Sequence, residues 1–131
     1  MPFLIDTDIF IHARDGNDAV LDKFADHARN IAISALSLAE LQRGFLLPST
    51  DIALRRARHD ALIRNLVVVP FDLAAVESYA LILATRGRVK ALDVDHMIAA
   101  HALSQRRVLV TANEVDFKGI PGLQLENWTT A

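Results

Sequence analysis

Two carboxylates follow directly on a short apolar run near the start of the chain. The run Phe3–Ile5 leads into Asp6, Thr7 and Asp8. Three apolar residues of this kind predict a short strand that is buried on both faces. In open α/β sheets, ligands bind beyond the carboxyl ends of the strands. An acid at that edge is partly desolvated and is destabilising unless a cation meets it, so Asp6 is predicted to anchor a cation-dependent site.

Three further acids fall near the ends of other predicted elements. They are Glu40, in the first turn of a helix after the second strand, Asp95, in the first turn of the helix before the fourth strand, and Asp116, which follows that strand with Asn113 in the same loop. Because parallel strands end at one edge of a sheet, Glu40 and Asp116 are expected to approach Asp6. Asp95 is expected to do so only if its helix begins at the same edge, after a kink near residues 88–92. Clustered carboxylates raise each other's pKa, and their oxygens suit magnesium or manganese.

Each of these acids also has an ordinary structural interpretation. Ser37 and Glu40 match a capping box, in which Glu40 only bonds free backbone amides at the start of its helix. Asp93 is interpreted as a helix N-cap rather than a ligand, and Asp95 fits a residue that complements the helix dipole. Asp116 fits an ordinary loop acid. These interpretations do not explain why several acids should share one edge.

The elements that must position the acids alternate along the chain. Strands are predicted at residues 3–5, 31–33, 66–69, 108–110 and 123–125, and helices at 9–13, 18–29, 37–46, 52–65, 72–87 and from 93 or 94 to 104. This alternation predicts a parallel sheet with right-handed crossovers and helices on both faces. The expected architecture is a single α/β domain, residues 1–131, with the layers α/β/α and a central parallel sheet.

The composition narrows the function classes. The chain has 131 residues, of which 52% are hydrophobic, and a formal net charge of −2. The absence of Cys from the sequence excludes disulfides, thiolate nucleophiles and cysteine zinc sites. No apolar run approaches the roughly 18 residues of a membrane span, and the N-terminus lacks the basic region of a signal peptide. The expected location is the cytoplasm. The net charge argues against a broadly basic nucleic-acid binder but does not exclude one, because metal ions can supply positive charge locally.

Several short motifs occur in a defined order along the whole chain. They are Leu4–Asp8, Ile33–Ser34, Ala39–Leu41 with Gly44, Asp95–Leu103, Leu109–Asn113, Asp116–Phe117, Pro121–Leu123 and Glu126–Trp128. Each motif alone is weak, but the ordered set resembles the PIN-domain proteins, specifically the VapC-type toxin ribonucleases. The resemblance implies an α/β/α sandwich and a Mg²⁺- or Mn²⁺-dependent endoribonuclease that a cognate antitoxin inhibits.

The resemblance also implies a set of four site residues. Asp6, Glu40 and Asp95 match three positions of the family's acidic quartet. Asn113 best matches the fourth position, which is often Asp in the family, and Asp116 is the nearest acid. Both alternatives stay open. Thr7 and Thr111 match hydroxyl positions beside the acids and are further candidate site residues, whereas Asp8 has no firm counterpart.

The reaction implied is hydrolysis of an RNA phosphodiester. Asp6 and Asp95 would hold a metal that lowers the pKa of its water and neutralises charge on the phosphoryl oxygens. Glu40 would bind the metal or orient the attacking water. The basic residues Arg86, Arg88 and Lys90 precede Asp95 and are candidate RNA contacts. The alternative for that segment is a solvated loop.

Two other functions remain open at this stage. Asp6 and Asp8 also fit the D-x-D of a haloacid-dehalogenase-like phosphatase, although Lys90 is a poor match for that family's lysine. A PIN-like binding module with an incomplete site is the second alternative, because Asn113 lacks a charge. The expected partners are the RNA substrate, a cognate antitoxin and a second copy of the chain, with no membrane. The apolar helices at 38–47 and 52–63 are candidate surfaces for protein partners.

Overall fold

A parallel five-stranded sheet organises the computed structural model, which describes residues 2–46, 48 and 50–130. The strands are β1 Phe3–Ile5, β2 Ile31–Ser34, β3 Val67–Val69, β4 Val108–Val110 and β5 Leu125–Glu126, in the spatial order β3-β2-β1-β4-β5. Leu4 of β1 lies level with Ala32 of β2 and Leu109 of β4. Since every pairing is parallel, the carboxyl ends of β1, β2 and β4 meet at one edge.

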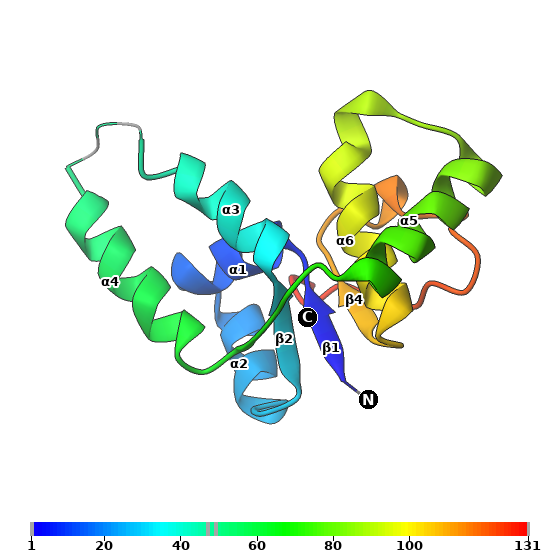
Figure 1. Cartoon of the computed structure of the whole chain (residues 1–131). Helices are drawn as coiled ribbons and strands as arrows, with labels where there is room; N and C mark the ends of the chain where they lie inside the picture. The colour runs from blue at the N-terminus through cyan, green and yellow to red at the C-terminus, as the bar shows by residue number, and fades with distance from the viewer. Residues whose placement is uncertain (1, 47, 49, 131) are drawn as a thin grey trace.

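Helices cover both faces of this sheet. They are α1 Thr7–Arg14, α2 Asp18–Asp26, α3 Ala35–Arg43, α4 Ile52–Ile63, α5 Leu73–Arg86 and α6 Asp93–Ser104, with two short 3₁₀ turns, η1 Lys90–Leu92 and η2 Glu114–Asp116. Helices α1 to α4 lie on one side and α5 with α6 on the other (Figure 1). The predicted three-layer α/β/α sandwich is confirmed. Within the described residues, no helix combines the length and apolar character that a membrane span requires.

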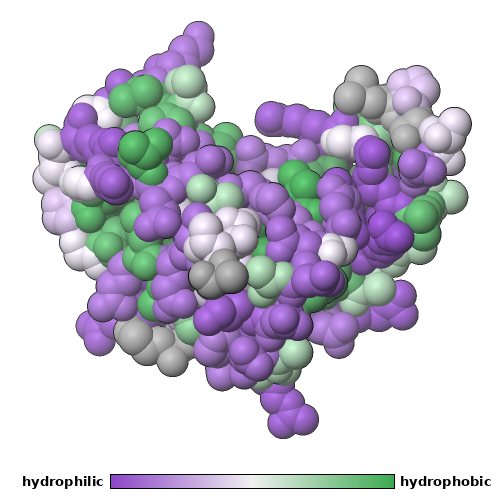
Figure 2. All heavy atoms as spheres, turned by 180° about the vertical axis from the view of Figure 1, so that it is seen from behind, coloured by the Kyte–Doolittle hydropathy of each residue, from purple (hydrophilic) through white to green (hydrophobic). Residues whose placement is uncertain are grey.

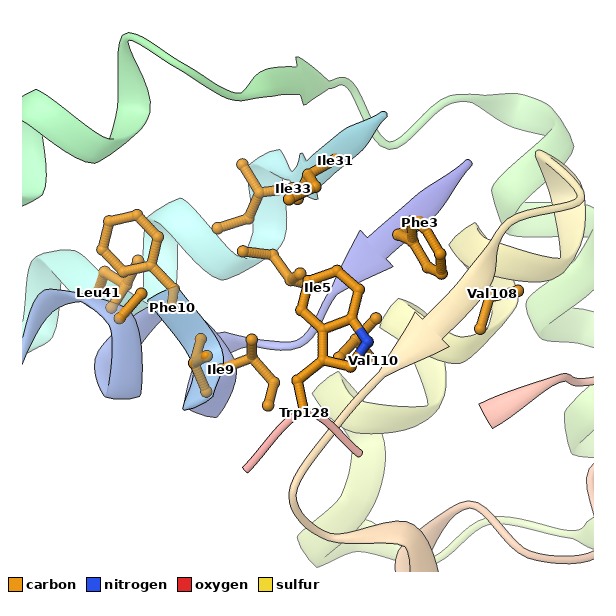
Figure 3. Close-up of a cluster of buried hydrophobic side chains, with 12 residues drawn as sticks. Phe3, Ile5, Ile9, Phe10, Ile31, Ile33, Leu41, Val108, Val110 and Trp128 are labelled. Atoms are coloured by element: carbon orange, nitrogen blue, oxygen red, sulfur yellow. The ribbon is translucent and has the colours of Figure 1, made fainter. Parts of the chain in front are cut away.

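The alternation of side chains along the short strands creates two cores. Phe3 and Ile5 face one core, which includes α1 residues and the buried Trp128 (Figure 3). Leu4 faces the other core, formed with α6 and with Phe117. Burial on both faces explains why β1 is apolar without polar alternation. The sheet edge is therefore stiff, and it fixes the backbone from which the acids project.

The structure corrects several predicted boundaries. Helix α3 begins at Ala35 and not at Ser37, because the Ser34 side chain accepts a hydrogen bond from the Leu36 amide at 3.1 Å and caps the helix. The capping box of Ser37 and Glu40 is therefore wrong. Helix α1 starts at Thr7, two residues before the predicted turn, because Asp6 serves as its N-cap. Helix α2 ends at Asp26, and the last strand, β5, begins two residues later than predicted.

Two buried histidines help to hold the helices in place. His59 of α4 is only 7% exposed and packs edge-on against Phe10 and Phe45. His101 is fully buried, and its Nδ1 lies 2.9 Å from the Ser34 hydroxyl. Burial lowers the pKa of both imidazoles. These contacts are structural and link α4 to α1, and α6 to the end of β2.

Candidate active site

Asp6 lies at the end of β1 and at the start of α1. Its Oδ1 accepts a hydrogen bond from the Thr7 amide at 2.8 Å, and its Oδ2 accepts one from the Thr111 hydroxyl at 3.0 Å. The side chain is 4% exposed. Burial, followed by the charges of Asp8 and Asp95, raises the pKa of Asp6 to about 7, and the two hydrogen bonds oppose this only weakly. The site thus contains a buried carboxylate whose charge is poorly compensated.

Glu40 reaches this edge from α3. It is the sixth residue of the helix, in its second turn rather than in the predicted first turn. Its Oε1 accepts a hydrogen bond of 2.6 Å from the Thr7 hydroxyl. Glu40 therefore cannot bond the free amides at the helix start, and its carboxylate is oriented toward the start of α1.

Asp95 is the third residue of α6 and is the electrostatic link between the acids. The 3₁₀ turn η1 precedes α6 at the place where the chain was expected to turn before reaching this edge. Burial raises the pKa of Asp95 to about 6, with further contributions from the charges of Glu40, Asp116 and Asp8. Acids from α1, α3, α6 and the segment after β4 therefore act on one another.

The two candidates for the fourth position have different surroundings. The Asn113 side chain donates from Nδ2 to Asp8 Oδ2 at 3.2 Å and is exposed. Asp116 ends the 3₁₀ turn η2, and its charge raises the pKa of Asp95. Asn113 is thus bonded to an acid, whereas Asp116 is an acid that acts directly on the group at the centre.

Asp8, which has no firm counterpart in the family's acidic quartet, is also part of this cluster. Its Oδ2 accepts hydrogen bonds from the Ala112 amide and from Asn113 Nδ2, each at 3.2 Å. Its Oδ1 is buried and makes no hydrogen bond of normal geometry within the described residues. Burial raises the pKa of Asp8, although the Ala112 amide opposes this. The available signal was its position two residues after Asp6, in the first turn of the helix that Asp6 caps.

The donor set of the cluster consists of oxygens. Carboxylate oxygens suit Mg²⁺ or Mn²⁺, and a buried polar oxygen without a hydrogen bond is a place where an ion or water is expected. Among the residues that the structure describes, no three acids or histidines are arranged tightly enough to form a ready-made metal cage. This arrangement still fits Mg²⁺, because Mg²⁺ keeps several waters and binds through one or two carboxylates. The surface above this edge is hollowed between the two groups of helices (Figure 2).

The basic segment before α6 is largely committed to contacts within the chain. Arg86 donates to the Lys118 carbonyl, and Arg88 forms an ion pair with Asp93 at 2.6 Å. Asp93 is therefore not an N-cap, since Leu92 holds that position without a side-chain hydrogen bond. Lys90 is exposed. The contact of these basic residues with RNA stays a prediction.

Comparisons with known proteins agree with this fold. The PIN domain family model matches residues 3–123. Ribonuclease VapC2 of Rickettsia felis is 34% identical, and tRNA(fMet)-specific endonuclease VapC of Salmonella typhimurium is 30% identical, each over 98% of both proteins. A crystal structure of VapBC2 from Rickettsia felis bound to a promoter DNA fragment superposes with a TM-score of 0.83 and 31% identity, over 98% of this chain and 99% of that one. The chain therefore belongs to the PIN domain family and, within it, to the VapC ribonucleases.

Proposed function

We propose that this chain is the endoribonuclease toxin of a toxin–antitoxin pair and that Mg²⁺ or Mn²⁺ supports its reaction. The whole chain, residues 1–131, would act as one domain in the cytoplasm, where its RNA substrate is found. The observation that carries the proposal is the mutual electrostatic influence of the acids around Asp95, which receives contributions from Glu40, Asp116 and Asp8. Such repulsion is relieved by a cation, and a phosphodiester needs one for its own charge.

Each residue has a role in this proposal. Asp6 and Asp95 hold the metal, and Glu40, fixed by Thr7, binds it or orients the attacking water. When bound, the metal supplies a polarised water and positive charge beside the phosphate. Thr111 donates to Asp6 and keeps that carboxylate turned toward the site.

The proposed protein partners are a cognate antitoxin and a second copy of the chain. The support is the VapBC2 complex to which the chain is similar, together with an apolar groove of about 410 Å³ between α2 and α4. The groove is lined by Leu21, Phe24, Leu62 and Leu66 among others. We expect co-purification with the product of a neighbouring small gene. Light scattering that shows a monomer, alone and with that product, would count against these partners.

A cellular experiment tests the toxin function. Induced expression of the wild-type chain should arrest growth and create new RNA ends at a defined sequence or structure, which sequencing of 5′ ends would locate. A transfer RNA is the first candidate, because a relative is named for tRNA(fMet). Asp95→Asn should remove both effects at equal protein level. Growth arrest that persists in Asp95→Asn without new RNA ends would contradict the proposal.

A further inference from the structure

We infer that Asp8 is a positioning residue of the candidate active site. Its carboxylate holds the segment 111–113, which follows β4, in the place from which Asp116 acts on Asp95. The inference rests on the proposed function, because it adds a residue to the same site. It differs from the four-residue set that the sequence predicts, in which Asp8 has no role.

The first observation is a pair of hydrogen bonds between distant parts of the chain. Asp8 Oδ2 accepts from the Ala112 amide and from Asn113 Nδ2, each at 3.2 Å. Asp8 belongs to the first turn of α1, whereas its two donors follow β4. One carboxylate oxygen therefore ties the start of a helix to a loop at the same sheet edge.

The second observation is that these bonds continue toward Asp116. The Asn113 amide donates to the Thr111 hydroxyl at 3.1 Å, and the Asn113 carbonyl accepts from the Asp116 amide at 3.1 Å. Asn113 is thus held through its side-chain Nδ2, its backbone N–H and its backbone carbonyl. Release of the Asn113 side chain by Asp8 would loosen the N-cap residue of the turn that carries Asp116.

The third observation concerns the two oxygens of Asp8. Both loop donors bond Oδ2, whereas no described residue makes a hydrogen bond of normal geometry to the buried Oδ1. An Asn side chain can present its single carbonyl oxygen to both donors, and its amide would replace Oδ1. An Ala side chain offers no acceptor. The variants Asp8→Asn and Asp8→Ala therefore separate support of the loop from a direct contribution of the second oxygen.

The experiment compares Asp8→Asn, Asp8→Ala and the control Asp22→Ala, which removes an exposed acid of α2. Three quantities are measured: hydrogen exchange of the Ala112 amide by NMR, the Mg²⁺ dissociation constant by calorimetry, and kcat with KM for an RNA substrate. In Asp8→Ala we expect faster exchange and a loss of about tenfold or more in Mg²⁺ affinity and in kcat, with little change in KM. Asp8→Asn should keep the Ala112 amide protected from exchange, and its Mg²⁺ affinity and kcat should fall only about threefold. Asp22→Ala should match the wild type.

Two outcomes would overturn the inference. If Asp8→Asn loses Mg²⁺ affinity as severely as Asp8→Ala while the Ala112 amide stays protected, Asp8 acts through Oδ1 as a ligand. If Asp8→Ala behaves as the wild type, Asp8 has no role in the site. If Asp8→Ala does not fold, Asn113→Ala takes its place, because it removes the hydrogen bond from Asn113 Nδ2 to Asp8 Oδ2. The same three quantities are then measured, and a variant that behaves as the wild type would count against the inference. A wild-type chain that cleaves no RNA contradicts the proposed function, and exchange with calorimetry still decides the role of Asp8.

Discussion

The Thr7 hydroxyl donates a hydrogen bond of 2.6 Å to Glu40 Oε1 and thereby joins the first turn of α1 to the second turn of α3. The two residues are 33 positions apart in the sequence. Thr7 also donates its backbone amide to Asp6. One threonine therefore orients two acids of the candidate site, the first through its backbone and the second through its side chain.

Loss of the Thr7 hydroxyl should impair the reaction more than the fold. Thr7→Val keeps the size of the side chain but removes the donor, so the Glu40 carboxylate loses a bond that contributes about 1.5–3 kcal/mol when one partner is charged. We expect kcat to fall roughly tenfold, and Thr7→Ser to restore it. Steady-state cleavage rates of the two variants check this. A Thr7→Val enzyme with the wild-type kcat would show that the bond does not orient Glu40 for the reaction.

Removal of the Asp6 charge should stabilise the metal-free chain at neutral pH. The pKa of Asp6 is raised to about 7, mainly by burial and then by the charges of Asp8 and Asp95. A pKa raised from 3.8 to about 7 corresponds to about 4 kcal/mol at most, and we expect Asp6→Asn to be more stable than the wild type by on the order of 2 kcal/mol when a chelator removes the metal. Thermal unfolding with EDTA and with Mg²⁺ measures this. The same increase in Tm on adding Mg²⁺ to both proteins would be inconsistent with Asp6 as a ligand.

The raised pKa values fix the sign of the pH dependence. Between its usual value of 3.8 and about 7, the folded chain holds the Asp6 proton that the unfolded chain releases. The free energy of unfolding without metal should therefore decrease as the pH rises through this window. Asp95, with its pKa raised to about 6 by burial and then by Glu40, acts in the same direction.

Metal binding should show the opposite trend, because a metal competes with these protons. The Mg²⁺ dissociation constant should decrease as the pH rises from about 5 to about 8. Calorimetric titrations at several pH values, in buffers with different ionisation enthalpies, would also count the protons released. An affinity that is independent of pH would mean that Asp6 and Asp95 do not hold the ion.

Asp116 is expected to matter more than a carboxylate at position 113. Asp116 acts electrostatically on Asp95, whereas the Asn113 side chain donates to Asp8. Asp116→Ala should lower the cleavage rate about tenfold, or about 1.4 kcal/mol of transition-state stabilisation. Asn113→Asp should also do harm, because a second carboxylate would face Asp8. Cleavage rates against Mg²⁺ concentration test both, and wild-type kinetics in Asp116→Ala would refute the choice of Asp116.

Much of the fold was predictable because its signals are local. The run Phe3–Ile5 and the strand Val108–Val110 are apolar without alternation, as strands buried on both faces require. The start of the helix predicted at 72–87 was also readable, since Asp is a preferred N-cap residue and Asp72 accepts a hydrogen bond from the Ala75 amide at the start of α5. The start of α3 was misplaced because Ser34 and Ser37 are both good cap residues. Only the length of β2 determines which one caps the helix.

The sequence predicted which acids approach one another, but not how they are connected. Strand ends and helix starts suggested that Asp6, Glu40, Asp95 and Asp116 share one edge, and the electrostatic influence of Glu40, Asp116 and Asp8 on Asp95 agrees with this. The role of Asp8 depends on contacts with Ala112 and Asn113, more than 100 positions away in the sequence. No periodicity within one element carries such information. Contacts of this kind follow from the packing of α1 against the end of β4.

The most direct measurement of the central claim is the cleavage of one RNA by the purified chain with Mg²⁺, Mn²⁺ or EDTA. The wild type and Asp95→Asn would be compared on that RNA and on DNA of the same sequence, with fragments resolved on a gel. The account predicts internal cleavage of the RNA that requires the metal and is abolished by EDTA. In Asp95→Asn the cleavage rate should fall by about a hundredfold or more. Cleavage that continues in EDTA, or that Asp95→Asn performs at the wild-type rate, would contradict an acidic metal site at this edge of the sheet.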